Sequence, residues 1–324
     1  MLARTVSASA RRALRPQLGF RTDFRSSVVL PMAQKRNASQ SAPSWLIDVF
    51  ESPPVVFAEQ TLTKIHELSG LPWWASIVIS TIGIRVFVTF PLAIYSEANL
   101  AKLASLEPEA REINQILKED TVLAKHKFNL TEQQATKLYR INLKKQMGLL
   151  IERNNCHPAK SFFLSLFQIP VWVSLSFALR DMAFAGKYGV YEYMSMSTEG
   201  IFWAKNLIHP DPFLILPVMT AVMNLTNTEL YQLKSNLPRS KFLKIFHNFS
   251  RVASVIVIPV GLVMPSAACL YWFCSASTAT GQQLILLSPR FRRLVRIPPS
   301  PKEDPTPYST IWSNFQSRIL RRGK

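Results

Sequence analysis

The chain has 324 residues, of which 48% are hydrophobic, and its mean hydropathy is +0.09. This balance excludes both an ordinary soluble domain and a chain that lies entirely within a membrane. The net charge of +18 is typical of proteins that bind nucleic acid or an anionic membrane surface. The placement of the charge, described below, favours the membrane, and the three cysteines, an odd number, predict no disulfide framework.

Residues 1–38 have the composition of a mitochondrial transit peptide. The first 36 residues hold eight Lys or Arg residues and one acid, Asp23. Serines are scattered among them, and the apolar core of a secretory signal peptide is absent from this sequence. We therefore predict a transit peptide that is removed close to Ala38, with a disordered basic tail as the alternative.

The first predicted membrane span covers residues 72–95 and contains a single charge, Arg85. A run of 24 residues is long enough to cross a bilayer, which needs about 20. A charge near the middle of such a helix costs at least ~2.5–3.5 kcal/mol on insertion scales. Arg85 is too deep to reach the interface easily by extending its side chain, so its charge predicts a wet cavity lined by protein.

Four further spans are predicted along the chain. They cover residues 161–183, 212–233, 247–264 and 266–287, and the sequence Met264-Pro265-Ser266 separates the last two. Together with residues 72–95 they give an all-α membrane protein with five transmembrane helices.

The charges of the connecting segments predict the orientation of these helices. The 234–246 loop has four basic residues and no acid, and the 288–324 tail has nine basic residues against two acids. The 39–71 segment holds one lysine and the 184–211 loop holds two. Because Lys and Arg collect on the inner side, we expect the N-terminal segment and the 184–211 loop in the intermembrane space. The 234–246 loop and the C-terminus are then in the matrix.

Residues 96–158 are predicted to form a helical hairpin in the matrix between the first and second spans. This segment has ten basic and eight acidic residues. Pro108 suits the first turn of a helix that continues to about Lys125. After a break at residues 126–130, Thr131 and Gln134 fit a capping box that opens a second helix ending near Arg153.

Enzymatic and metal chemistry receive little support from the sequence. It contains no GxSxG, HExxH, Walker lysine or GxGxxG motif. The five histidines are scattered without the spacing of metal ligands, and the adjacent Cys156 and His157 fit packing better than a metal site. We therefore predict a protein that is not an enzyme, with no metal and no cofactor.

Polar residues inside the predicted spans point to a groove. With Arg85, the predicted groove residues are Gln168, Asn224, Asn227, Ser275, Thr278 and Gln282. Hydrogen bonds between helices, at about 0.6 kcal/mol each, are the alternative explanation for such residues. Most of them lie toward the predicted matrix ends of their helices, and so does Arg85. The sequence therefore predicts a polar groove that is open to the matrix and closed toward the intermembrane space.

Five motifs, in order over residues 70–290, resemble the YidC/Oxa family of membrane insertases. They are LPWWASIVISTIGIRVFVTFPLA, LEPEAREI, FQIPVWVSLSFALR, GIFWAKNLIHPDPFLILP and MPSAACLYWFCSA. The resemblance implies an insertase whose groove receives a hydrophilic segment of a client protein.

Within that family, NNCHP before residue 159 and the TPY-containing tail most resemble the branch that assembles cytochrome c oxidase in mitochondria. That branch implies an inner-membrane protein that exports the C-terminal domain of oxidase subunit 2. The expected partners are this client, its assembly chaperones and membrane lipid, and no nucleic acid. The general Oxa insertase has a long basic tail for ribosomes, whereas this tail is short and interrupted by prolines, which argues against stable ribosome docking.

Three other functions compete with this interpretation. A general inner-membrane insertase shares the groove and differs in its range of clients. A small-anion carrier would also place a cation in a cavity, but carriers usually show paired repeats, and this sequence shows none. An intramembrane enzyme would need a nucleophile–base or metal pair, which the sequence does not supply.

Overall fold

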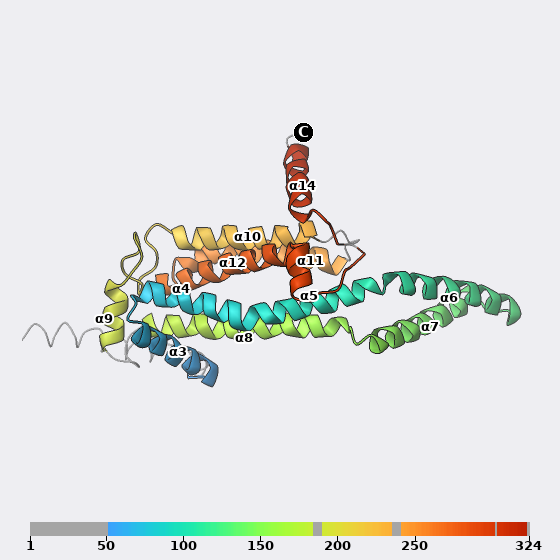
Figure 1. The fold of residues 1–324 in the computed structure, drawn as a ribbon, viewed down its shortest axis with the longest axis horizontal. Helices are drawn as coiled ribbons and strands as arrows, with labels where there is room; N and C mark the ends of the chain where they lie inside the picture. Colours follow the sequence, from blue (N-terminus) through green and yellow to red (C-terminus); the bar gives the residue numbers. More distant parts are fainter. Residues whose placement is uncertain (1–50, 184–189, 235–240, 302, 323–324) are drawn as a thin grey trace, which may run out of the picture.

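The computed structural model of the chain describes residues 51–183, 190–234, 241–301 and 303–322. The secondary structure within these ranges is helical (Figure 1), apart from an isolated β-bridge between Ile201 and Ala204. The predicted all-α class is therefore confirmed for the described residues. The predicted transit peptide, residues 1–38, lies outside them.

A bundle of helices runs along the long axis of the molecule (Figure 1). Its members are α4 (Trp73–Ile84), the π-helical turn η1 (Arg85–Thr89), α5 (Phe90–Ser105), α8 (Pro158–Ala183), α10 (Ile215–Lys234), α11 (Lys241–Gly261) and α12 (Ser266–Leu287). The central helix is α12, which packs against α4, α8 and α10, while α11 packs on α10. Close packing of α10 and α11 requires a glycine, because a Cβ on Gly261 would lie 2.3 Å from Pro217 Cγ.

The observed helices match the predicted spans to different degrees. The predicted fifth span has the same bounds as α12, and the second and third differ from α8 and α10 by at most 3 residues at an end. The fourth begins earlier than predicted, at Lys241. The helix of the first span continues past Tyr95 to Ser105, because Ser96–Ser105 contains neither proline nor glycine to stop it.

Two helical stretches, Trp73–Lys127 and Pro158–Ala183, are long and apolar enough to cross a membrane. The helices α10, α11 and α12 carry more polar or charged residues and do not meet this test. Their crossing of the membrane, and with it the count of five spans, stays a prediction.

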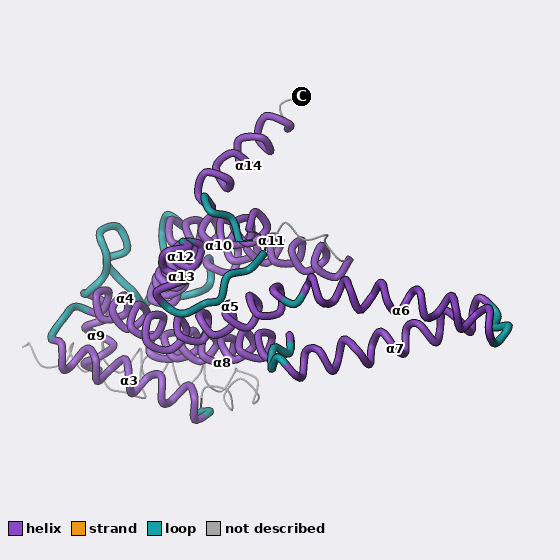
Figure 2. Tube along the Cα trace, turned by 45° about the vertical axis from the view of Figure 1, so that its right-hand side comes forward, coloured by secondary structure: helices purple, strands orange, loops and turns teal. Residues whose placement is uncertain are grey.

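A long helical hairpin extends from one end of the bundle (Figures 1 and 2). Its first arm, α6 (Glu107–Lys127), continues from α5 after Leu106, and its second arm, α7 (Glu132–Arg153), packs back along α6. The helical stretch Trp73–Lys127 has 55 residues. At the usual rise it is ~80 Å long, against a hydrocarbon core of ~30 Å. The hairpin therefore lies beyond the bundle, and its location in the matrix stays a prediction.

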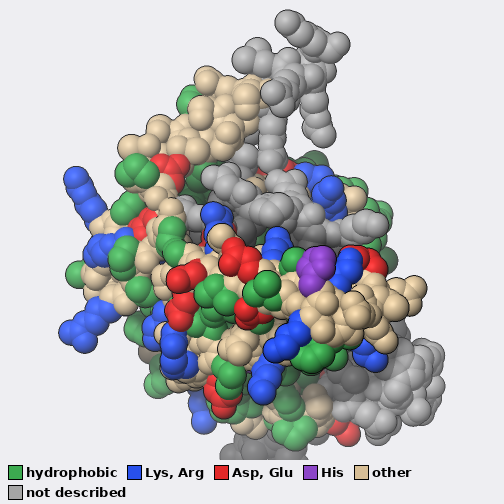
Figure 3. All heavy atoms as spheres, turned by 90° about the vertical axis from the view of Figure 1, so that its right-hand side faces the viewer, with side chains coloured by type: hydrophobic (Ala, Val, Ile, Leu, Met, Phe, Trp, Pro, Cys, Tyr) green, Lys and Arg blue, Asp and Glu red, His purple; other side chains and the backbone are tan. Residues whose placement is uncertain are grey.

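Polar contacts stabilise the hairpin at the start of α7 and between its two arms. The predicted capping box is present. The backbone N–H of Gln134 donates to Thr131 Oγ1, and the backbone N–H of Thr131 donates to Gln134 Oε1. Arg153 pairs with Glu109 and links the two arms at their base. Seen end-on, the hairpin carries Lys, Arg, Asp and Glu side chains interspersed with hydrophobic ones, as expected for a surface in water (Figure 3).

At the hairpin turn, Lys125 forms an ion pair with Glu132. The pKa of the Glu132 carboxyl lies below its ordinary value, mainly because Lys125 donates a hydrogen bond to it. The positive charge of Lys125 lowers this pKa further. Because the folded-state pKa is lowered, this pair stabilises the turn above the ordinary pKa, and its contribution is lost as the pH falls through the folded-state pKa. Both side chains are exposed, so the contribution is small.

Four shorter helices at the two ends of the bundle were not predicted from the sequence. At the end that holds Trp73 are α3 (Pro53–Ser69), which packs on α8 and α4, and α9 (Val190–Thr198). At the opposite end are α13 (Pro289–Leu294) and α14 (Pro307–Arg322). Between α13 and α14, the described residues of the proline-rich stretch form no helix, and the Glu303 N–H donates to the Ser300 carbonyl in a turn.

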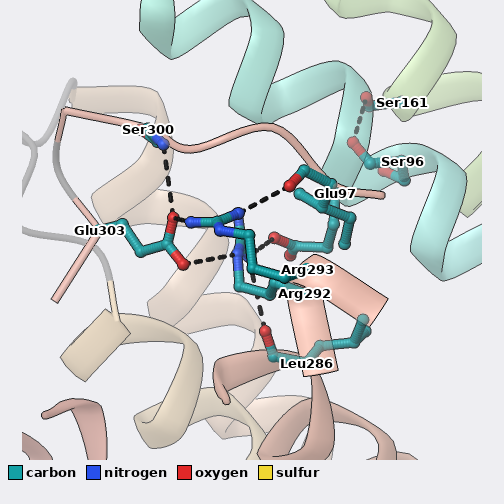
Figure 4. Close-up of polar contacts among 9 residues, drawn as sticks. Ser96, Glu97, Ser161, Leu286, Arg292, Arg293, Ser300 and Glu303 are labelled. Carbon is teal, nitrogen blue, oxygen red and sulfur yellow. Dashed lines mark hydrogen bonds and ion pairs between the residues drawn. The ribbon is translucent and has the colours of Figure 1, made fainter. Parts of the chain in front are cut away.

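A cluster of charged side chains fastens the segment after α12 to α5 (Figure 4). The Arg292 side chain is 9% exposed, and its Nη1 donates to Glu97 Oε2 at 3.1 Å. Arg292 Nε also lies 3.5 Å from Glu303 Oε1, and Arg293 pairs with the same carboxylate. Ile297 is buried beside this cluster, where it packs with Ala101 and Leu286. We call Glu97, Arg292, Arg293 and Glu303 the clamp, because together they hold α5, α13 and the tail against one another.

Candidate functional site

A cavity of about 250 Å³ lies beside Arg85, between the α4–η1 segment, α8 and α12. Its walls are formed by Thr81, Ile84, Arg85, Thr89, Gln168, Ile169, Val171, Trp172, Leu175, Tyr271 and Ser275. Three of the seven predicted groove residues, Arg85, Gln168 and Ser275, are thus brought to one cavity. They come from three helices that are far apart in the sequence.

The guanidinium of Arg85 is held by one hydroxyl group. Nε and Nη2 of Arg85 donate to Ser275 Oγ at 3.0 and 2.5 Å. Among the described residues, no carboxylate forms an ion pair with Arg85. The charge is therefore oriented by a neutral partner and remains uncompensated within the described part of the chain.

The backbone at Arg85 is unusual, because Arg85–Thr89 forms a π-helical turn. Pro91 follows this turn, and a proline inside an α-helix removes one backbone hydrogen bond and crowds the carbonyl four residues before it. The wider turn accommodates that crowding and changes the partners of the Arg85 carbonyl. This oxygen accepts hydrogen bonds from the Phe90 N–H, from Thr89 Oγ1 at 3.0 Å and from Gln282 Nε2 at 2.7 Å.

Gln282 therefore contacts the site through the Arg85 backbone, although its side chain is not among the cavity walls. Its bond joins the last third of α12 to the π turn. Turns of this kind occur frequently at functional sites. Arg85 is consequently fixed to α12 at two points, with Ser275 at its side chain and Gln282 at its carbonyl.

The remaining predicted groove residues, Asn224, Asn227 and Thr278, do not line this cavity. Asn227 joins two helices, because its Nδ2 donates to the Ala276 carbonyl at 3.1 Å and its Oδ1 accepts from Thr280 at 3.0 Å. Thr278 bonds the carbonyl of Cys274 in its own helix. For Asn227, the structure shows the helix-joining contact that was the alternative explanation, and a role of these three residues in client binding stays a prediction.

The end of the bundle at Trp73 is closed by packed side chains. The Trp73 indole stacks on His66 with ring centroids 4.1 Å apart, and its Nε1 donates to Ser195 Oγ at 2.8 Å. The Trp73 backbone N–H donates to Glu199 Oε2. Trp73 and Ile77 are fully buried there, together with Leu179, Met196 and Leu207. The bundle is therefore densely packed at that end, and the closure of the groove toward the intermembrane space stays a prediction.

A family model described as "60Kd inner membrane protein" matches residues 64–292 of this chain. The chain belongs to this family, which is the YidC/Oxa family that the motifs resemble.

Relatives in the 60Kd inner membrane protein family fall into two groups. The mitochondrial cytochrome c oxidase assembly protein COX18 of Mus musculus is 36% identical over 90% of this chain and 89% of its own length. The human COX18 protein is 35% identical over 87% of this chain and 85% of its own length. The mitochondrial inner membrane protein OXA1L of Bos taurus is 27% identical over 78% of this chain and 53% of its own length.

Sequence reasoning missed several residues that line the cavity in this family member, among them Thr81, Thr89, Trp172 and Tyr271. Thr89 lies four residues after Arg85, so its place on the same helix face could have indicated its contact with the Arg85 carbonyl. Tyr271 lies four residues before Ser275, but a tyrosine in an apolar helix is usually a packing residue. For Tyr271 the sequence offers no signal that separates cavity wall from core.

Proposed function

We propose that this protein is a mitochondrial inner-membrane insertase for cytochrome c oxidase assembly, and that it exports the hydrophilic C-terminal domain of oxidase subunit 2. The observation that carries the proposal is the position of Arg85, which lines one cavity with Gln168 and Ser275 and forms no ion pair with a carboxylate among the described residues. The identity to COX18 proteins over most of the chain supports the link to oxidase assembly. The expected partners are subunit 2, its assembly chaperones and membrane lipid, with no nucleic acid.

The surface of the bundle supports five membrane crossings. On α11, large apolar side chains are exposed along one face, at Val252, Val255, Ile256 and Val260. On α4, η1 and α8, Ile79, Phe87, Phe163 and Phe167 are similarly exposed. Apolar surface on this scale is not stable in water and marks contact with lipid or protein. We infer that α10, α11 and α12 cross the membrane with the two more apolar helices, with the Trp73 end in the intermembrane space and the C-terminus in the matrix.

The cavity can lower the cost of moving a hydrophilic segment into the membrane. A buried polar group without a hydrogen-bond partner costs roughly 2–7 kcal/mol. Arg85, Gln168 and Ser275 offer donors and acceptors to such a segment, and the buried side chains around Trp73 pack the bundle at its other end. An acidic side chain ~4 Å from Arg85 would gain about 4 kcal/mol at an effective dielectric constant of 20, against about 1 kcal/mol in water. The client would thus be attracted as it leaves water.

The test replaces Arg85 in cells that depend on this protein. We expect Arg85→Leu to abolish export of the subunit 2 C-terminal domain while the protein still accumulates, because leucine at that depth costs the helix nothing. Arg85→Lys should keep part of the activity, because the charge contributes more than the shape of the guanidinium. The measurement is protection of the client domain from protease added outside the inner membrane, at matched expression.

Arg111→Leu is the matched control, because it removes an arginine of the hairpin that is 77% exposed and pairs only along its own helix. It should leave export intact. Normal export with Arg85→Leu would contradict the proposal and leave the charge with a structural role.

The match to OXA1L supports a second candidate, a general inner-membrane insertase. Depletion of this protein followed by proteomics of the inner membrane separates the two functions. Loss confined to cytochrome c oxidase subunits supports the first, and loss of many inner-membrane proteins supports the second. Tail-dependent, salt-resistant co-sedimentation with mitochondrial ribosomes would also favour the general insertase, whereas we expect no stable docking from this short tail.

A further inference from the structure

The last helix of the described chain, α14 (Pro307–Arg322), runs across the direction of the bundle helices (Figures 1 and 2). It starts at the depth where α12 ends. The Tyr308 hydroxyl donates to the carbonyl of Leu284, in the last turn of α12, at 2.9 Å. Near this point α14 also packs against α10. A helix in this place lies close to the plane in which the bundle would leave the membrane.

One face of α14 is apolar. Tyr308, Ile311 and Trp312 share this face by the helical period, and the side chains of Tyr308 and Trp312 are 51% and 61% exposed. The sequence repeats apolar residues in the same register at positions 315 and 319. Ser309, Ser313 and Ser317 occupy the other side and are exposed. Because Tyr308 bonds the carbonyl of Leu284 at the surface of α12, the start of the apolar face lies at the level of the last turn of that helix.

The charge around this helix has one sign. Residues 305–324 contain three arginines and one lysine, all from position 318 onward, and no acidic residue. A helix with an apolar face, Trp or Phe on that face, basic residues and low overall hydrophobicity is typical of segments that lie in the interface of an anionic membrane. The four basic residues complement phospholipid phosphates, and the serine face suits water.

We propose that α14 is an interfacial helix that binds the anionic lipid surface on the matrix side, with its apolar face at the acyl boundary. The proposal rests on the membrane orientation put forward above for the bundle. It gives the tail a lipid partner and a role separate from client export. The tail then anchors the matrix end of α12 in the plane of the headgroups.

The test places a nitroxide label on the full-length protein in vesicles. Single substitutions Ile311→Cys and Ser313→Cys put the label on opposite faces of α14, and the unsubstituted protein gives the background from the three native cysteines, of which two are buried and one is half-buried. The vesicles contain phosphatidylcholine alone or with an equal amount of phosphatidylglycerol. Collision with oxygen reports lipid, and collision with a water-soluble nickel chelate reports water.

With phosphatidylglycerol we expect the label at Ile311 to be accessible to oxygen and protected from nickel, and the label at Ser313 to show the reverse. Combined Arg318→Gln, Arg321→Gln and Arg322→Gln should abolish the difference between the two lipid compositions. Equal nickel accessibility at Ile311 and Ser313 would overturn the proposal. Protection of Ile311 that appears only after mitochondrial ribosomes are added would also overturn it, because the partner would then be RNA or ribosomal protein.

A label at Val255, exposed on α11, separates this inference from the proposed function. If the Val255→Cys label lies in lipid while Ile311→Cys lies in water, only the assignment of α14 is wrong. If both lie in water, the membrane orientation of the bundle is wrong as well, and both proposals fail.

Discussion

Arg85 is joined to α12 by its side chain and by its carbonyl oxygen, and the two bonds have different roles. Ser275 orients the guanidinium, whereas Gln282 reaches the carbonyl that the π turn leaves without an ordinary i+4 partner. The position of the charge therefore depends on a side chain that never touches the cavity. Gln282 is accordingly a positioning residue in the proposed export reaction.

Gln282→Leu should reduce client export, because it removes the bond that fixes the π turn to α12. A hydrogen bond of this kind contributes a net ~0.5–1.5 kcal/mol, so we expect partial loss compared with Arg85→Leu. Gln283→Leu is the matched control, because it makes the same substitution at the next position of α12, and Gln283 is neither among the residues that bond Arg85 nor among those that line the cavity. The measurement is export at matched protein levels, and equal export by the two variants would contradict a positioning role for Gln282.

The sequence alone identifies Arg85 but cannot identify its partners. A lone charge in an apolar run is visible without a structure, since the energetic cost of the charge demands an explanation. Ser275 and Gln282 lie 190 and 197 residues away along the chain, so their contacts with Arg85 depend on how α4 and α12 pack. Asn227 was predicted as a groove residue because it is a polar side chain within a span. In the structure it lies on α10 and bonds α12, so it links the two helices.

At the scale of the elements, local chemistry predicted the hairpin well. Proline near the start of α6 and the Thr131–Gln134 box at the start of α7 are signals that act within one helical turn, and both helices begin where these signals lie. The first span was predicted to end at Tyr95, where hydropathy falls, but the helix itself continues to Ser105. The helix α14 was not predicted, because the prolines of the tail indicate no helix, and it begins at Pro307, the last of these prolines.

Ile141→Pro tests whether the hairpin contributes to function. Proline in the middle of α7 should cost ~3 kcal/mol or more of local helix stability and lower client export. Ile141→Ala keeps the helix and removes only an apolar side chain that is 56% exposed, so it serves as the control. The comparison is client export at equal abundance. Full export with the proline variant would show that the helical structure of α7 is not needed, and that the hairpin acts only as a spacer.

At the scale of the whole molecule, the proposed orientation makes a direct prediction for protease protection. Protease added to mitoplasts should cleave within residues 40–70 and spare both the hairpin and the C-terminus, because the charge of the connecting segments places these on the matrix side. Fragments are detected with antibodies against each end. If protease added outside cleaves within residues 107–153, the proposed orientation is wrong. The assignment of α14 to the matrix leaflet would then be wrong as well.

The clamp fixes the long helix at Glu97, where Arg292 binds α5. This point lies between the hairpin tip and Arg85. The outer arm, from Glu97 to Lys127, is ~45 Å long, and the inner arm back to Arg85 is ~18 Å long at the usual helical rise. A swing of ~10 Å at the hairpin tip would then move Arg85 by ~4 Å in the opposite direction, if the helix turns as a rigid rod. Such a displacement exceeds the length of the Arg85–Ser275 hydrogen bonds, so a rigid swing of that size would break them although the hairpin tip does not contact the cavity.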